Sequence, residues 1–197
     1  MKKSFIIAAI ALVCGTMAYA QPRAIGGRLG WNEAFVYQHT LTDKTFIEAN
    51  VGVFGVGYDT KANVFSGGIH VDFIHEWIWL TPNWTERGEW NWFAGVGANV
   101  GWLWSDLHPV KDNTGFVANY NAQPLMAGAV ANIGLEYTFW FPLSLAVDYR
   151  PTFGALIGKD AGSTMMSDGT TVVPFRFYMG GLFDIAISVR YRFGMRD

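Results

Sequence analysis

Apolar and polar residues alternate along most of this chain. The clearest stretch is 175–193, where most odd-numbered residues are apolar and Asp184, Arg190 and Arg192 fall between them. The same period recurs, more briefly, at 47–51, 69–73, 94–101, 129–137 and 143–150. A period of two places successive side chains on opposite faces of a β-strand. The pattern therefore predicts long strands whose two faces meet different surroundings.

The segment 89–104 indicates what those surroundings are. Its apolar face begins with Trp90 and Trp92, continues through small aliphatic residues and ends with Trp102 and Trp104. The ten residue steps from Trp92 to Trp102 span roughly 33 Å at about 3.3 Å per residue. A strand of that length tilted by about 35–45° rises roughly 25 Å, the height of the apolar band on a membrane-spanning barrel. Strands of soluble proteins average about 5–6 residues, so a long-stranded soluble sandwich is the weaker alternative. The predicted aromatic girdle consists of Trp77, Trp79, Trp90, Trp92, Trp102, Trp104 and Tyr191.

The connections set the number of strands. Turn-forming residues lie at 42–44, 59–63, 81–89, 105–123, 140–142 and 157–174. A closed barrel of this kind needs an even number of strands, so the segment 24–41 is divided near Trp31 and Asn32. The prediction is an all-β fold, an eight-stranded antiparallel transmembrane up-and-down β-barrel in a single domain, 21–197. The expected strands are 24–31, 33–41, 45–58, 64–80, 89–104, 124–140, 142–156 and 175–193.

The first twenty residues have the three parts of a secretory signal peptide. Lys2 and Lys3 form the positive region, 5–17 is apolar, and Ala18-Tyr19-Ala20 is a small-x-small cleavage site. We therefore expect 1–20 to be removed. The one cysteine, Cys14, lies inside this segment, so the mature chain is expected to have no disulfide and no thiolate metal site.

Composition and charge exclude several classes of protein. After residue 20 no apolar run approaches the roughly 18 residues that a membrane-spanning helix needs. The formal net charge is −2, and the sequence contains no cluster of basic residues. Nucleic acid is therefore not expected as a partner.

Membrane physics predicts which face of each strand points inward. An arginine facing lipid costs about 2–4 kcal/mol at the midplane, so the charged positions must face the interior and their apolar neighbours the lipid. An eight-stranded barrel is just wide enough for side chains to fill it, which predicts a lumen of paired charges. The predicted luminal charges are Arg28, Glu48, Asp72, Glu76, Glu136, Asp148, Arg150, Asp184 and Arg190.

Several motifs resemble those of a known family. They are Ala24-Ile-Gly-Gly-Arg-Leu-Gly30, Tyr37-Gln-His39, Asn91-Trp-Phe-Ala-Gly-Val-Gly97, Asn132-Ile-Gly-Leu-Glu-Tyr137, Leu145-Ala-Val-Asp-Tyr-Arg-Pro151 and Val189-Arg-Tyr-Arg-Phe193. Together they resemble the small single-domain outer-membrane β-barrel proteins of the OmpA/OmpX-like superfamily. The resemblance implies the outer membrane of a didermal bacterium, with outer-membrane lipid and the barrel-insertion machinery as partners. It specifies no reaction. The segment Val189–Phe193 resembles the terminal signal that this machinery reads, although four further residues follow it here.

The function expected from these features is a structural or surface-interaction role through long extracellular loops. Candidate contacts with an unknown extracellular ligand are Phe116, Tyr120, Met165 and Met166, in the loops 105–123 and 157–174. Aromatic and amide groups on surface loops offer contacts to proteins or sugars. Mobile tips without a partner are the simpler alternative.

Two other functions remain as alternatives. The first is a narrow gated pore in which the luminal ion pairs rearrange. The second is a lipid-modifying enzyme, for which His108, with Ser105 and Asp106 nearby, is the one histidine placed for lipid chemistry. A solvated loop histidine explains His108 more simply, so we expect no enzyme. No cofactor is expected, and the histidine spacing does not indicate a metal site.

Overall fold

A computed structural model describes residues 22–30, 32–59, 64–111, 117–122, 124–166, 169–180 and 183–194. The proposed signal peptide and Phe116 lie outside them. Within the described ranges, no helix is long and apolar enough to cross a membrane.

The described chain forms eleven β-strands. The strands are β1 (Arg23–Gly30), β2 (Asn32–Thr42), β3 (Thr45–Asp59), β4 (Val64–Leu80), β5 (Glu89–Lys111), β6 (Val117–Ala122), β7 (Leu125–Thr138), β8 (Leu143–Tyr149), β9 (Thr152–Met166), β10 (Gly169–Gly180) and β11 (Ile185–Phe193). All the pairings between them are antiparallel.

Eight of these strands close a ring, in the order β1-β2-β3-β4-β5-β7-β8-β11 and back to β1. The predicted eight-stranded antiparallel barrel is confirmed. Two of the expected strands are interrupted in the structure. The segment 142–156 is divided at Arg150 and Pro151 into β8 and β9, and 175–193 is divided before Ile185 into β10 and β11. Proline has no N–H to donate to a ladder, which accounts for the first interruption.

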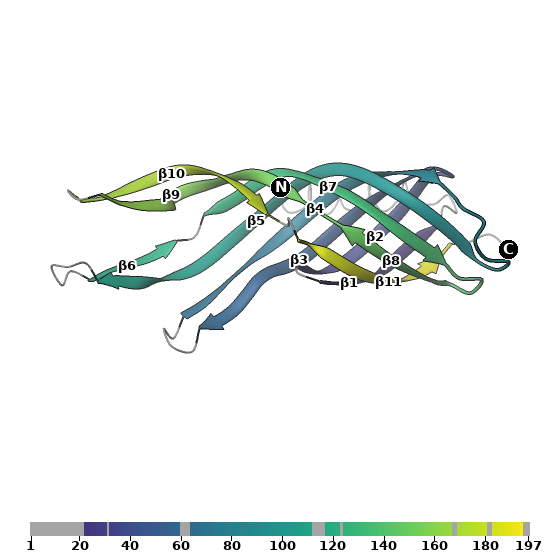
Figure 1. The fold of residues 1–197 in the computed structure, drawn as a ribbon, viewed down its shortest axis with the longest axis horizontal. Coiled ribbons are helices and arrows are strands. Elements are labelled where there is room, and N and C mark those ends of the chain that lie inside the picture. The colour runs from purple at the N-terminus through teal and green to yellow at the C-terminus, as the bar shows by residue number, and fades with distance from the viewer. Residues whose placement is uncertain are drawn as a thin grey trace, which may run out of the picture.

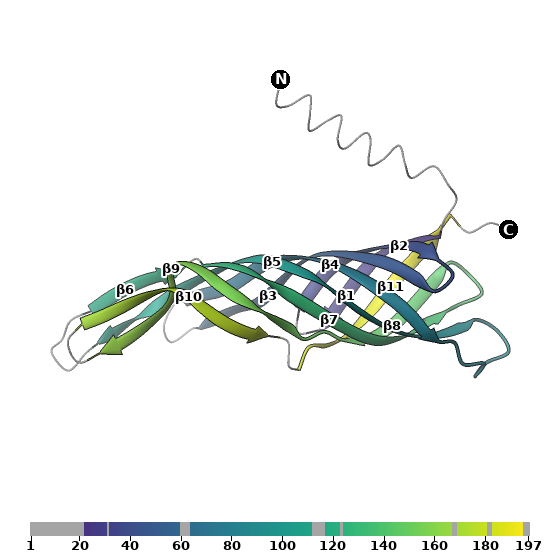
Figure 2. The ribbon, with the colours of Figure 1, turned by 90° about the horizontal axis from the view of Figure 1, so that it is seen from above.

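The segments 105–123 and 157–174, expected as loops, are largely strand, and this correction changes the outline of the molecule. β5 continues to Lys111 and pairs with β6, while β9 continues to Met166 and pairs with β10. Figure 1 shows these two hairpins and the tip of β3–β4 projecting from one end of the barrel. Figure 2 shows the β5–β6 and β9–β10 hairpins at the end opposite the start of β1 and the end of β11. Pairing gives their backbone groups the partners that an open loop lacks.

The β1–β2 hairpin is much shorter than its neighbours. β1 ends at Gly30 and β2 begins at Asn32, so the predicted division near Trp31 and Asn32 is confirmed. β10 lies beyond the end of this hairpin and pairs with β9 alone among the described strands. The ring is therefore complete in one half of the barrel, and β10 leaves a free strand edge in the other half.

Each strand places its apolar side chains on the outside of the barrel and its polar side chains on the inside. A soluble protein has the reverse arrangement. On β11, Ile187 is 55% exposed while its neighbour Ser188 is fully buried. On β8, Val147 is 49% exposed while Asp148 is 1% exposed. The barrel has an apolar outer surface and a polar interior.

Candidate functional site in the barrel interior

The nine charged residues predicted to lie inside the barrel all have buried side chains. They reach the interior from β1, β3, β4, β7, β8 and β11, and from the short connections that hold Arg150 and Asp184. Strand register brings residues distant in the sequence together. Arg28 lies opposite Ser188, and Asp148 lies opposite Ala186, so β1, β11 and β8 contribute to one cluster.

A chain of four charged groups runs through the middle of the interior. One Glu48 carboxylate oxygen accepts a hydrogen bond from Nη2 of Arg150 at 2.7 Å, and the other accepts one from Nη2 of Arg190 at 2.8 Å. Nη1 of Arg190 donates to Glu136 at 2.6 Å. Asn50 also donates to Glu48. Glu48 is therefore the shared anion of two buried arginines.

A second cluster lies around Arg28. Its guanidinium contacts Asp148 at 2.8 Å and Asp184 at 3.2 Å. Asn32 donates its side-chain amide to Asp184 at 2.9 Å, and the Asn32 carbonyl accepts from Arg28. Arg150 joins the two clusters, because its Nη2 lies 3.5 Å from Asp148. These charge-assisted bonds hold β1, β8 and β11 at a fixed spacing.

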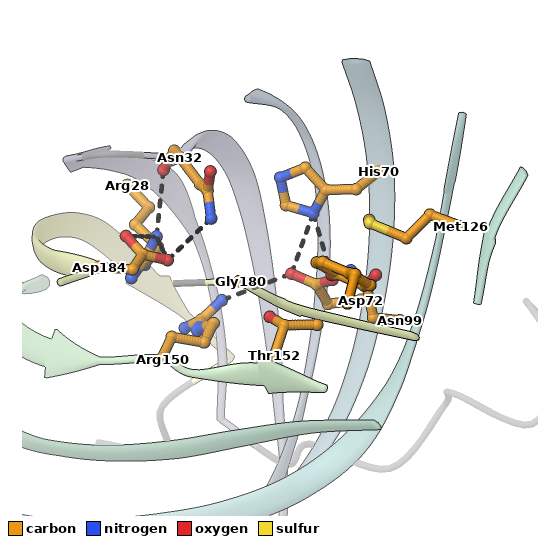
Figure 3. A pocket seen from close by; sticks show the side chains of 11 residues that line it. Arg28, Asn32, His70, Asp72, Asn99, Met126, Arg150, Thr152, Gly180 and Asp184 are labelled. Atoms are coloured by element: carbon orange, nitrogen blue, oxygen red, sulfur yellow. Dashed lines mark hydrogen bonds and ion pairs between the residues drawn. The ribbon is translucent and has the colours of Figure 1, made fainter. Parts of the chain in front are cut away.

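The opposite wall of the interior carries a histidine and amides. Nδ1 of His70 lies 3.1 Å from the Asp72 carboxylate, and Asn99 also donates to that carboxylate. Arg150 reaches toward Asp72 at 3.9 Å. Figure 3 shows His70, Asp72 and Asn99 facing Arg28 and Asp184 across a cavity.

Carboxylates outnumber arginines in this interior. Among the described residues, three arginines and six carboxylates are buried. Among the described residues, no arginine or lysine nitrogen lies within 4 Å of Glu76, whose one side-chain hydrogen bond there comes from Asn132 at 2.7 Å. Its second oxygen has no hydrogen-bond partner. The absence of a side chain at Gly95 makes room for it, since a Cβ there would lie 2.1 Å from that oxygen.

Two cavities lie at the two ends of the charged chain. The first is about 120 Å³ and is lined by Arg150 among other residues, and the second is about 310 Å³ and is lined by Glu136. Phe46 and Phe93 also line the second cavity, and their rings meet edge to face at 5.7 Å. Charged groups and this aromatic pair fill the space between the cavities.

Several of these residues were not expected inside the barrel. Phe46, Phe93 and Met126 are buried apolar residues in an interior predicted to be polar. Tyr178 and Thr152 line the first cavity beside Met126. The signal for the two aromatic residues was their place in the alternation, because Phe46 shares a strand face with Glu48 and Phe93 shares one with Asn99. The Pro151 break, which brings Thr152 to the cavity wall, was visible in the sequence as a proline.

The predicted girdle residues lie at both ends of the outer surface, with more of them at one end than at the other. Trp77, Trp79, Trp90 and Trp92 lie on β4 and β5 at the end away from the projecting hairpins. There Trp79 and Trp92 are 6.0 Å apart, and Trp90 stacks near Tyr137 at 4.6 Å. Tyr191 is exposed on β11. Trp102 and Trp104 lie toward the other end of β5.

The remaining candidates fall outside what the structure describes in side-chain detail. The backbones of Tyr120, Met165, Met166 and His108 lie in β6, β9 and β5, and their side chains are not described. Within the described residues, no group of three or more histidine, cysteine, aspartate or glutamate side chains is placed to hold a metal ion. No protein-family model, curated protein or solved structure matches the chain.

Proposed function

We propose that this protein is an integral outer-membrane β-barrel with a structural or surface-interaction role. The observation that carries this proposal is the reversed polarity of the barrel. Phe73, Val147 and Ile187 are about half exposed on the outside, whereas Asp72 and Asp148 beside them are buried. In water such a surface would be an aggregation hazard, but in a bilayer it matches the solvent, and the closed ring satisfies the backbone.

The projecting hairpins are the parts available to an extracellular partner. In this proposal the β3–β4, β5–β6 and β9–β10 tips face outward, and the short turns face the periplasm, as in other outer-membrane barrels. Outer-membrane lipid surrounds the barrel, and the insertion machinery assembles it. We propose a non-catalytic role, because the described interior charges other than Glu76 are engaged with one another and the outer tips carry the candidate contacts.

The test compares two substitutions of exposed apolar residues by arginine. Val147 lies in the middle of the outer apolar surface on β8, and Trp84 is exposed in the connection between β4 and β5. An arginine in the bilayer midplane costs about 2–4 kcal/mol, and one near the interface costs about 0–1 kcal/mol. Val147→Arg should therefore reduce insertion of the refolded chain 21–197 into lipid vesicles, and Trp84→Arg should leave it nearly unchanged. Insertion is measured by protease protection and by the heat-dependent shift in electrophoretic mobility.

A water-soluble barrel would show no difference between the two variants. Both side chains are exposed, so in water both arginines would be solvated and would have similarly small effects. Equal insertion of the two variants, or a wild-type chain that stays soluble without detergent, would overturn the membrane proposal.

A narrow gated pore is the second candidate function. The observation that favours it is the charged chain Arg150–Glu48–Arg190–Glu136, which links a group on the first cavity to a group on the second. If these pairs exchanged partners, they would offer an ion path through the barrel. Its conductance test is given in the Discussion.

A further inference from the structure

The free edge of β10 lies beside the first cavity. β10 pairs with β9 along one edge, and no other described strand pairs with its second edge. The β1–β2 hairpin, which would have to lie there to continue the ring, ends at Gly30 and Asn32. Among the described residues, no strand pairing therefore closes the barrel wall between the inner end of β10 and the tip of this hairpin.

Residues from both sides of this break line the same cavity. Tyr178 and Gly180 contribute from β10, and Arg28 and Asn32 contribute from the β1–β2 hairpin. In Figure 3, Gly180 lies between Asp184 on one side and Thr152 and Asp72 on the other. The cavity of about 120 Å³ has the volume of roughly four liquid water molecules, so it suits a small polar group.

The polar groups of the cavity are balanced in charge and include unused bonding capacity. Its lining contains two arginines, Arg28 and Arg150, and two aspartates, Asp72 and Asp184. Nε of Arg150 and Oδ1 of Asn99 are buried without a hydrogen-bond partner, in side chains that are 2% and 3% exposed. One is a donor and the other an acceptor. A ligand that accepts from one and donates to the other would satisfy both, whereas a ligand of net negative charge would add to an interior in which, among the described residues, six buried carboxylates already face three arginines.

The outer surface around the break is apolar. Phe177 is 80% exposed and Met179 58% exposed on β10, and Phe183 is 87% exposed just after it. Leu29 and Phe35 are exposed on the β1–β2 hairpin. A free strand edge facing hydrocarbon leaves backbone groups without partners, at several kcal/mol each. A molecule with a polar head and an apolar tail would bring hydrogen-bonding groups to the edge and the cavity, and its tail would lie against these apolar side chains.

We propose that this break is a lateral binding site for a zwitterionic amphiphile of the outer membrane, with the phosphoethanolamine head as the chemical class. The phosphate accepts hydrogen bonds on the arginine side of the cavity, and the ammonium donates to Asp72 and Asn99. The acyl tail leaves between β10 and the β1–β2 hairpin and lies against Phe177 and Met179. This inference rests on the proposed membrane location, because only a bilayer presents such a ligand from the side.

The test measures lipid retention by two glycine variants. The refolded chain 21–197 in detergent is titrated with lysophosphatidylethanolamine and examined by native mass spectrometry. A Cβ at Gly180 would lie 2.7 Å from the Tyr178 ring, so Gly180→Val crowds the cavity at the break. The matched control is Gly27→Val, since a Cβ at Gly27 meets nothing within 4 Å. We expect one lipid to be retained by the wild type and by Gly27→Val, and roughly tenfold weaker retention by Gly180→Val.

A second, milder variant tests the site in case Gly180→Val does not fold. Tyr178→Phe keeps the ring and removes one hydroxyl from the cavity lining, and it should weaken retention several-fold. Folding of every variant is checked by circular dichroism and by insertion into vesicles. Equal retention by the wild type, Gly180→Val and Tyr178→Phe would overturn the site while leaving the membrane proposal intact, whereas a wild type that fails to insert would overturn the membrane proposal.

Two further ligands test the chemistry and the route. Lysophosphatidylglycerol has the same kind of tail with a net negative head, and it should bind more weakly; equal binding would overturn the assignment of a zwitterionic head. Free O-phosphorylethanolamine has the head without the tail. It should compete poorly, and competition at equal concentration would show that the site takes a soluble phosphate compound and would overturn lateral entry.

Discussion

Buried glutamates in this barrel differ in their partners, and that difference decides what each contributes to stability. Glu48 and Glu76 are both fully buried and lie on neighbouring strands. Glu48 bonds Arg150 and Arg190, whereas Glu76 is bonded by Asn132 alone. Removing one partner of a buried ion pair leaves an uncompensated charge, which costs about 3–5 kcal/mol. A buried carboxylate without a cationic partner has the same cost of desolvation, and no ion pair offsets that cost.

The same substitution at these two positions should therefore have very different effects. Glu48→Gln leaves two buried arginines short of a counter-ion, and we expect it to lower the free energy of unfolding by about 3–5 kcal/mol. Glu76→Gln keeps an oxygen that can accept from Asn132 and removes an unpaired charge, so we expect a change below about 1 kcal/mol or a gain. Urea unfolding of the two variants in lipid vesicles, followed by tryptophan fluorescence, measures both. Equal losses would show that the ion pairs of Glu48 do not stabilise the barrel.

At the scale of single residues, the sequence predicted whether a side chain points into or out of the barrel, but it did not predict which residues form ion pairs inside. Alternation together with the cost of charge in lipid placed Asp148 and Arg190 inside, because a strand has only two faces. The pairing of Arg190 with Glu48 depends on how several strands are staggered around the ring, and a local pattern does not contain that stagger. The inward Phe46 and Phe93 were missed because the interior residues were chosen by polarity, although the period of two places Phe46 on the face of Glu48 and Phe93 on the face of Asn99.

Among the elements, the contact between β1 and β11 closes the ring, and the two backbones approach closely at Gly26. Gly26 of β1 lies opposite Arg190 of β11. A Cβ at Gly26 would lie 1.9 Å from the Val189 carbonyl oxygen and 2.7 Å from the Arg190 Cα, which are both backbone atoms. Backbone cannot move aside as a flexible side chain can, so this position requires glycine for the two strands to pair.

Substituting the two neighbouring glycines of β1 tests this closure. Gly26→Ala forces β1 and β11 apart, and we expect a loss of roughly 1–3 kcal/mol and a lower yield of the heat-modifiable folded form. Gly27→Ala places its methyl group in open space and should fold as the wild type does. The two variants share the same change in chain entropy, so the difference between their urea midpoints isolates the strand contact. A Gly26→Ala barrel as stable as Gly27→Ala would mean that the ring does not close as described.

Strand number was predictable, and strand ends were not. The even number required of a closed barrel correctly divided 24–41 into two strands, although no strong turn motif marks the division. The extension of β5 to Lys111 and of β9 to Met166 was missed, because the segments 105–123 and 157–174 combine glycine, asparagine and proline with strand-forming residues. A paired hairpin tolerates such residues once each strand has a neighbour. The interruption before β11 also went unnoticed, since alternation continues across it.

For the molecule as a whole, the decisive question is whether the interior conducts. The first cavity and the second have no lining residue in common. Between them lie the Glu48–Arg190–Glu136 bonds, 2.6–2.8 Å long, and the edge-to-face pair of Phe46 and Phe93. An eight-stranded barrel encloses only enough space for its own side chains. The structure therefore describes a barrel filled across its middle.

We expect the refolded chain 21–197 to insert into a planar bilayer and to remain electrically silent at high salt. Ions would have to break at least one charge-assisted bond of the central chain, and each buried pair resists separation because its members lose their counter-charge together. Single-channel recording measures this, with insertion verified by protease protection of the same preparation. Glu136→Gln, which replaces the carboxylate of the charged chain that lines the second cavity, should also be silent. Discrete conductance steps in the wild type that change size in Glu136→Gln would contradict the filled interior. They would make the gated pore the better account of the charged chain, since an ion path along these pairs must respond to the charge at Glu136.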